Sequence, residues 1–202
     1  MSFWKDLRTF FGKKNEMPEI DLEIYANMPL FQMSENDIPF NDWRSPEANI
    51  PDGLEDLFRI SVWMYQMYAF YILTGDRFGQ EIADRVLRFQ VERISKLSEE
   101  MGQQLQAAIQ QIHRIVTHPF VAEVKGQKVE MPVEYGIAME FLTLGENAPY
   151  PLDVEKFQAD ESNMPDTNSA ELSLMACLVH GREKALSYFT PMTNMKVILS
   201  GV

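Results

Sequence analysis

The sequence from Ile60 to Leu73 reads ISVWMYQMYAFYIL, and it is apolar on almost every side of a helix. A helix of this composition is normally central and buried. Its three tyrosines then need hydrogen-bond partners for their hydroxyl groups, or a route to water. The stretch is shorter than the about 20 apolar residues that a membrane-spanning helix needs. We therefore predict a buried helix over about 53–73, with an aromatic surface for a partner or ligand as the alternative.

A second helix is predicted to follow the turn signal Thr74-Gly75 and to run over about 76–117. Apolar residues recur there at steps of three and four, and Gly102 marks a bend or break. An unbroken helix of this length would span about 63 Å. So long an apolar stripe needs a long partner, which favours an antiparallel bundle, a homodimer, or both.

The C-terminal part of the chain carries signals for short strands and two further helices. Residues 121–124 and 128–131 favour β structure and flank a turn that contains glycine, which predicts a hairpin. Helices are expected over about 132–144 and 169–188. A strand over 195–199 could join the hairpin. The predicted fold class is therefore mainly α, a helical bundle with a small β hairpin or three-stranded patch.

The N-terminal segment, residues 1–14, is predicted to be an amphipathic helix. Aromatic residues share one face and basic residues flank it, a pattern typical of interfacial membrane helices. A helix docked on the core is the alternative. The candidate membrane-facing residues are Phe3, Trp4, Leu7, Phe10, Phe11, Lys13 and Lys14.

Residues 15–52 are acidic and rich in proline, so a long helix is excluded there. Apolar and acidic residues alternate from Ile20 to Ile24, which suits an edge strand. The segment holds too many aromatic residues for a free linker. We interpret it as an ordered arm that wraps a helical core over 53–202, within a single domain over 1–202.

The net charge of -12 comes from 30 acidic and 18 basic residues, and it is unevenly spread. Acidic residues dominate residues 15–58 and the expected loop over 145–168. Nucleic acid is a poor partner for such a chain, because phosphate contacts need lysine and arginine. An acidic surface instead suits a basic protein. The candidate partner-binding residues are Asp21, Glu23, Trp63, Tyr65, Tyr68, Asp153, Glu155, Asp160 and Glu161.

The sequence carries no strong catalytic signature. The histidines His113, His118 and His180 lack the spacing of a metal site, and no phosphate-binding or dinucleotide motif is present. The one cysteine, Cys177, lies in an apolar run typical of a buried, inert thiol. We therefore predict no catalytic residue, cofactor or metal ion.

Three functions fit these patterns. The leading hypothesis is a non-enzymatic, cytoplasmic interaction protein (an adaptor, a chaperone or an inhibitor or immunity-type protein) with an acidic surface for a basic partner. The lone cysteine and the lack of an apolar leader favour the cytoplasm. The second hypothesis is a peripheral membrane protein that makes a weak contact with the inner membrane face through residues 1–14. The third is an enzyme with an acidic or tyrosine-lined pocket.

Overall fold

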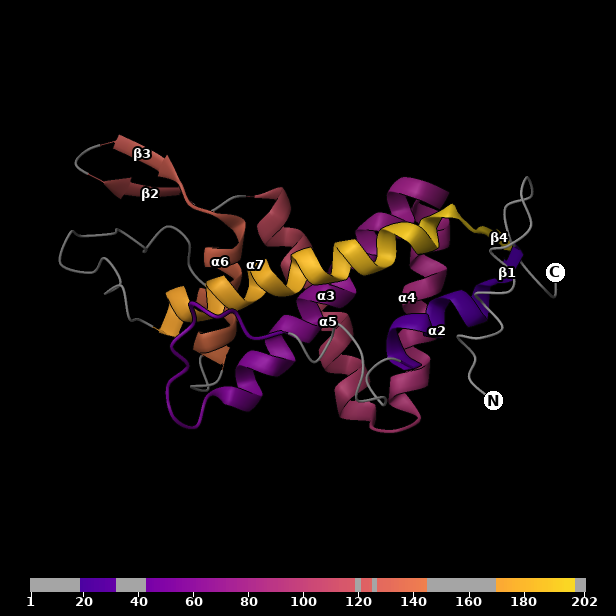
Figure 1. Cartoon of the computed structure of the whole chain (residues 1–202), viewed down its shortest axis with the longest axis horizontal. Helices are drawn as coiled ribbons and strands as arrows, with labels where there is room; N and C mark the ends of the chain where they lie inside the picture. Colours follow the sequence, from indigo (N-terminus) through magenta and orange to yellow (C-terminus); the bar gives the residue numbers. More distant parts are fainter. Residues whose placement is uncertain (1–18, 32–42, 119–120, 125–126, 145–169, 199–202) are drawn as a thin grey trace.

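A computed structural model gives the fold of residues 19–31, 43–118, 121–124, 127–144 and 170–198. These residues are mostly helical with two small sheets, which confirms the predicted mainly α bundle with a β hairpin (Figure 1). The helices are α2 (Leu22–Phe31), α3 (Glu55–Phe78), α4 (Gln80–Ser95), α5 (Glu99–Thr117), α6 (Val133–Leu144) and α7 (Ala170–Phe189). The strands are β1 (Glu19–Asp21), β2 (Val121–Val124), β3 (Gln127–Glu130) and β4 (Lys196–Ile198), and a short 3-10 helix, η3 (Thr190–Asn194), precedes β4.

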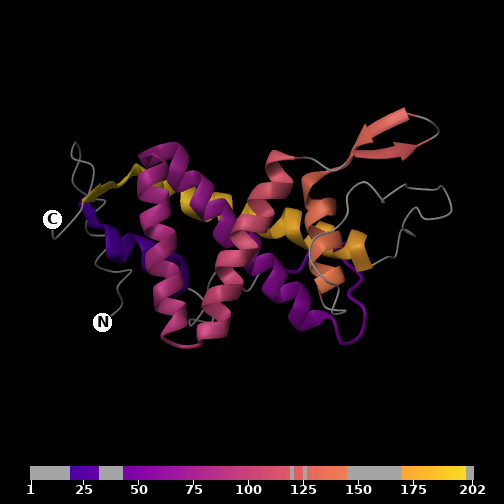
Figure 2. The ribbon, with the colours of Figure 1, turned by 180° about the vertical axis from the view of Figure 1, so that it is seen from behind.

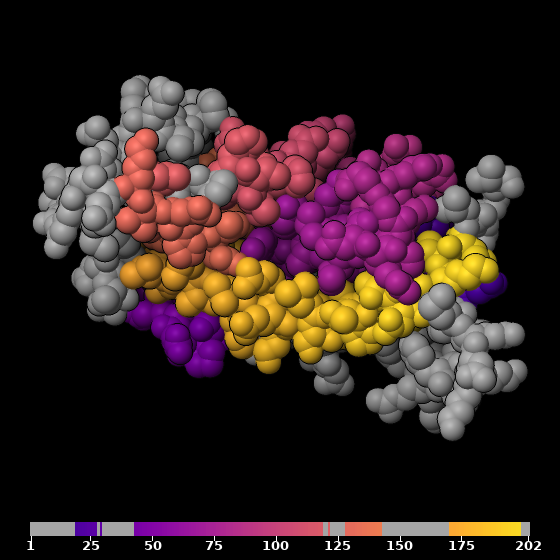
Figure 3. Space-filling view, turned by 90° about the horizontal axis from the view of Figure 1, so that it is seen from above, coloured from indigo at the N-terminus to yellow at the C-terminus, as the bar shows by residue number. Residues whose placement is uncertain are grey.

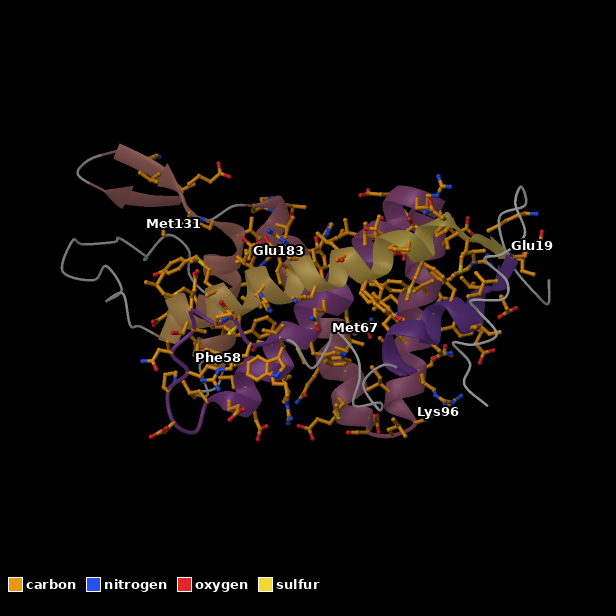
Figure 4. The ribbon with its side chains drawn as sticks, in the orientation of Figure 1. Glu19, Phe58, Met67, Lys96, Met131 and Glu183 are labelled. Carbon is orange, nitrogen blue, oxygen red and sulfur yellow. The ribbon has the colours of Figure 1, made fainter. Side chains whose placement is uncertain are left out.

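Helix α3 forms the centre of the fold because its apolar residues continue around the whole helix. Every residue from Ser61 to Phe70 is buried, and Phe58 and Met67 are fully enclosed. Helices α4, α5, α6 and α7 all pack against α3, so it has neighbours on several sides (Figure 4). The predicted buried helix is therefore confirmed, and it ends later than the expected residue 73.

The long helix predicted over 76–117 is two helices in the structure. Helix α3 continues through Gly75, and the chain turns at Gly79, whose φ of 90° favours glycine over residues with a side chain. Helix α4 then ends at Ser95. Ser98 begins α5 by accepting a hydrogen bond at its Oγ from the backbone N–H of Met101 (3.3 Å).

Helices α4 and α5 form a close hairpin, shown from behind in Figure 2. Gly102 lies within α5 and does not bend it. A Cβ atom at this position would lie 1.9 Å from the Oγ of Ser95. The glycine therefore allows the start of α5 to lie close to the end of α4. The apolar stripe that was expected to need a long partner is folded into this hairpin and packs within the chain.

Helices α6 and α7 lie almost where the sequence predicts them. Helix α7 follows α3 closely and runs as an orange-to-yellow band along the molecule in Figure 3. Gly181 permits this contact, because a Cβ atom there would lie 2.3 Å from the Cγ1 of Val62. The Nε2 of Gln66 also donates a hydrogen bond to the Gly181 carbonyl oxygen (3.1 Å). The absence of a side chain at Gly181 and the hydrogen bond from the Gln66 amide thus fix the position of α7 against α3.

The hairpin of β2 and β3 is confirmed, but the three-stranded patch does not form among the described residues. Strand β4 pairs in parallel with β1, and Ile20 lies opposite Val197. The Nζ of Lys196 also donates to the Oε1 of Glu19 (2.7 Å). The physical reason is distance, because α7 carries the chain to the end of the molecule opposite the hairpin (Figure 1).

Part of the predicted arm over 15–52 is described, as β1, α2 and residues 43–52. Helix α2 packs against α4, where the Nε2 of Gln90 donates to the Ala26 carbonyl oxygen (2.9 Å). Tyr25 is fully buried against Phe70 and Phe78. The predicted helix over 1–14 and the acidic loop over 145–168 lie outside the described residues. Among the helices of the described chain, none combines the length and the apolar character needed to cross a membrane.

Candidate functional site

Three tyrosines form a row along α3. Tyr65, Tyr68 and Tyr71 follow one another at intervals of three residues, so they share one side of the helix. Neighbouring ring centroids lie 6.4 and 6.3 Å apart. Tyr65 and Tyr68 are buried, whereas Tyr71 is half-buried. We call these three residues the tyrosine row.

Each hydroxyl group of the tyrosine row reaches a different helix. Tyr65 donates to the Oε1 of Glu134 on α6 (3.0 Å), and Tyr71 donates to the Oδ1 of Asp84 on α4 (2.9 Å). The hydroxyl group of Tyr68 lies 3.2 Å from the Nδ1 of His113 on α5. The expectation that these hydroxyl groups need partners is confirmed.

At the inner end of the row, the buried carboxylate of Glu134 pairs with the half-buried guanidinium of Arg182. Glu134 is nearly enclosed, and its Oε1 accepts hydrogen bonds from Tyr65 and from Arg182 of α7. Burial, together with the Glu134 carboxylate, raises the pKa of Tyr65 well above its usual range. Burial also raises the pKa of Tyr68 to about 12. Both side chains therefore stay neutral near pH 7, and Tyr65 acts as a hydrogen-bond donor to Glu134.

A second buried carboxyl group lies on α6 but faces α5. The Oε1 of Glu140 accepts a hydrogen bond from Gln111 and lies 3.9 Å from the Arg114 guanidinium. Burial raises the pKa of Glu140, while Arg114 and Gln111 oppose this shift. Glu134 and Glu140 thus have separate partners, and the described residues contain no group of metal-ligating side chains. These contacts join α6 to α3, α5 and α7, so the polar groups of this region stabilise the packing of the helices.

The structure places the aromatic candidates Trp63, Tyr65 and Tyr68 in the core. Their exposed fractions are 7%, 4% and 4%, which fits a central, buried helix rather than an aromatic surface. The Nε1 of Trp63 is buried and has no hydrogen-bond partner among the described residues. A partner protein therefore meets none of these three side chains in this conformation.

The acidic candidates are only partly described. The Oδ1 of Asp21 accepts a hydrogen bond from the backbone N–H of Glu23 (2.8 Å), so Asp21 stabilises the start of α2, and Glu23 is exposed. Asp153, Glu155, Asp160 and Glu161 lie outside the described residues, as do the candidate membrane-facing residues Phe3, Trp4, Leu7, Phe10, Phe11, Lys13 and Lys14. These residues remain predictions.

The structure adds a set of exposed acidic residues that the sequence interpretation did not single out. Glu47 and Asp52 are exposed in the segment before α3, and Glu55 and Asp56 are exposed in the first turn of α3. We call these four residues the acidic end. Within the described part of the chain, only Asp56 has a cationic partner, Arg59 at 2.7 Å. The charge map placed these residues in the acidic block over 15–58, but no local signal separated them from their neighbours.

Other sequence expectations concern single residues. Cys177 is fully buried, and burial raises the pKa of its thiol, which matches the expected inert cysteine. His113 is engaged by Tyr68. The contact between Glu134 and Arg182 was not predicted, because no local sequence pattern distinguishes a charged helix residue that pairs with a distant residue from one that faces solvent.

Comparison with known proteins adds no functional information. No protein-family model matches the chain, and no curated protein and no solved structure is significantly similar to it.

Proposed function

We propose that this chain is a non-enzymatic interaction module that binds a basic protein through the acidic end. The observation that carries the proposal is the exposure of Glu47, Asp52 and Glu55 without an ion-pair partner among the described residues. Exposed carboxylates of one sign steer a basic protein into contact and make the association sensitive to salt.

The acidic end sits on a segment that is held firmly. Trp43, Ser45 and Ala48 are buried, although they lie in an irregular stretch. The Oγ of Ser45 accepts a hydrogen bond from the Glu47 backbone (3.3 Å), and the Leu54 N–H donates to the Pro51 carbonyl oxygen (3.1 Å). A segment that is ordered before binding loses little conformational entropy on association. This order supports a binding surface rather than a linker.

The surface of α4 gives a useful contrast. There the Nη2 of Arg85 lies 2.9 Å from the Oε1 of Glu81, so charges of opposite sign alternate and compensate one another. Asp84 accepts a hydrogen bond from Tyr71. The acidic end has less internal compensation, which supports recognition of an external cation. We also propose a cytoplasmic location, because a reducing compartment suits a chain with one buried thiol.

The experiment is a quantitative pull-down from native lysate with the full chain at low and moderate salt. The test variant is E47K/D52K/E55K. The matched control is E92K/E99K/E100K, which changes the net charge equally and also alters the first turn of a helix. Wild type and control should capture the same basic protein in near-stoichiometric amounts. The test variant should capture at least tenfold less of this protein. The proposal is overturned if no salt-dependent partner appears, or if the test variant retains it.

A further inference from the structure

The β2–β3 hairpin stands apart from the helical bundle (Figures 1 and 2). Its two strands pack against each other, and no described helix packs extensively against either strand. Val121 and Val129 are 46% and 42% exposed. An isolated two-stranded hairpin is only marginally stable in water, and its outer edges carry unpaired backbone groups. The hairpin therefore has the features of an element that another strand completes.

The register of the hairpin identifies which backbone groups face outward on β3. Gln127 is opposite Val124, and Lys128 and Glu130 are opposite Glu123 and Val121. Two residues separate Val124 from Gln127, and the pair that flanks a two-residue connection is hydrogen-bonded. Val124 and Gln127 therefore form a hydrogen-bonded pair. Since hydrogen-bonded and non-hydrogen-bonded pairs alternate in antiparallel sheets, Lys128 and Glu130 direct their amide and carbonyl groups away from β2.

The outer edge of β3 is complementary to itself. When two copies of β3 run antiparallel about a twofold axis at Val129, Lys128 of each copy lies opposite Glu130 of the other. These are the residues whose backbone groups face outward, so the geometry provides both the backbone hydrogen bonds and opposite charges across the new pair. A twofold axis requires this self-complementarity.

The edge of β2 does not offer the same arrangement. Its one charged residue, Glu123, would lie opposite either itself or an uncharged residue of β2 in a twofold pairing. Like charges directly opposite are destabilising. Beyond β3, Pro132 has no N–H group, so it limits how far the β3 edge can pair. Charge and backbone together favour one edge and one register.

We propose that a second copy of this chain pairs with the β3 edge, forming a four-stranded antiparallel sheet with Lys128 opposite Glu130 in both directions. The contact is small, so the dimer dissociates on dilution and weakens with added salt. It uses residues distinct from the acidic end, so it stands or falls independently of the proposed function.

The test is sedimentation velocity of the full chain over a range of concentrations at low salt. The variant E130K places lysine opposite lysine in the dimer while leaving the Glu123–Lys128 pair of the hairpin unchanged. The variant E123K/K128E/E130K inverts the three charged residues of β2 and β3 and restores complementarity in both the hairpin and the dimer. The variant E99K, on α5, is the control for net charge.

Wild type, E99K and the triple variant should form concentration-dependent dimers with similar dissociation constants. E130K should raise the dissociation constant at least tenfold. The proposal is overturned if wild type stays monomeric at every concentration, which would leave the edge for a different chain. It is also overturned if E130K dimerises as well as wild type, or if the triple variant fails to recover while circular dichroism shows it to be folded.

Discussion

The tyrosine row of α3 and the β2–β3 hairpin are held in place in opposite ways. Tyr65, Tyr68 and Tyr71 each contact a different helix, so the row joins α3 to α6, α5 and α4. The hairpin is paired mainly with itself and exposes Val121 and Val129. A change in the core around the row should therefore affect the whole bundle. A change in the hairpin should affect association and leave the stability of the bundle nearly unchanged.

The largest effect is expected for Gly181→Val, at the contact between α3 and α7. The added side chain would collide with Val62, whose Cγ1 would lie 2.3 Å from the new Cβ, and α7 would have to move away. Overpacking of this kind costs about 3 kcal/mol, at the upper end of its usual range. Urea denaturation measures the loss. Ser187→Val, on the exposed side of α7, is the control, and an equal loss in both variants would contradict close packing at Gly181.

A smaller effect is expected for Tyr65→Phe, at the buried end of the tyrosine row. The change removes one donor from Glu134, which keeps Arg182 as its partner. Loss of a hydrogen bond to a charged group costs about 1.5–3 kcal/mol, and the lower half of this range is expected here because Arg182 still pairs with Glu134. Tyr71→Phe removes only the hydroxyl group of the half-buried Tyr71, whose hydrogen bond to Asp84 is exposed, and should cost about 0.5 kcal/mol or less. Equal losses in the two variants would mean that burial does not determine how much each tyrosine hydroxyl group contributes to the free energy of unfolding.

Alkaline pH offers a way to break the row without substitution. Burial raises the pKa of Tyr68 to about 12, above the value of about 10 in the unfolded chain. The native chain therefore retains the proton more strongly than the unfolded chain does. The Tyr68 hydroxyl should contribute fully to the free energy of unfolding below about pH 10. This contribution should be lost as the pH rises from about 10 to 12. Tyrosinate absorbance and urea titrations measure both changes, and a tyrosine titration centred near pH 10 throughout would contradict the buried row.

The contrast between the tyrosine row and the hairpin can be predicted in part from the sequence. The rest depends on contacts between residues that are distant in the sequence. The apolar run from Ile60 to Leu73 predicts burial, and the need of its tyrosines for partners follows directly. The identity of a partner such as Glu134, 69 residues from Tyr65, does not follow, because an isolated glutamate in a helix has no distinguishing local pattern.

The division of the chain into helices shows the same limit. Gly75, Gly79 and Gly102 are all potential helix breakers, but only Gly79 adopts a positive φ. Gly75 lies inside α3, and Gly102 lies against Ser95. Tertiary packing therefore decides which glycine ends a helix. The parallel pairing of β1 with β4 is likewise set by the path of α7 rather than by a local signal.

The smallest effect is expected for Val129→Thr in the hairpin. The side chain is exposed, and its replacement keeps the β-branched shape, so the free energy of unfolding should change by less than about 0.5 kcal/mol. Urea denaturation at a concentration too low for dimers measures this change. A loss above about 1 kcal/mol would mean that the hairpin contributes to the core.

Hydrogen exchange of the backbone amides tests most directly whether the bundle and the hairpin are held independently. In dilute solution, amides of Ser61–Phe70 should exchange only through global unfolding, whereas those of β2 and β3 should exchange orders of magnitude faster. Raising the protein concentration should slow exchange at Lys128 and Glu130 and leave α3 unchanged. Equal protection of the hairpin and α3 in dilute solution would contradict the account.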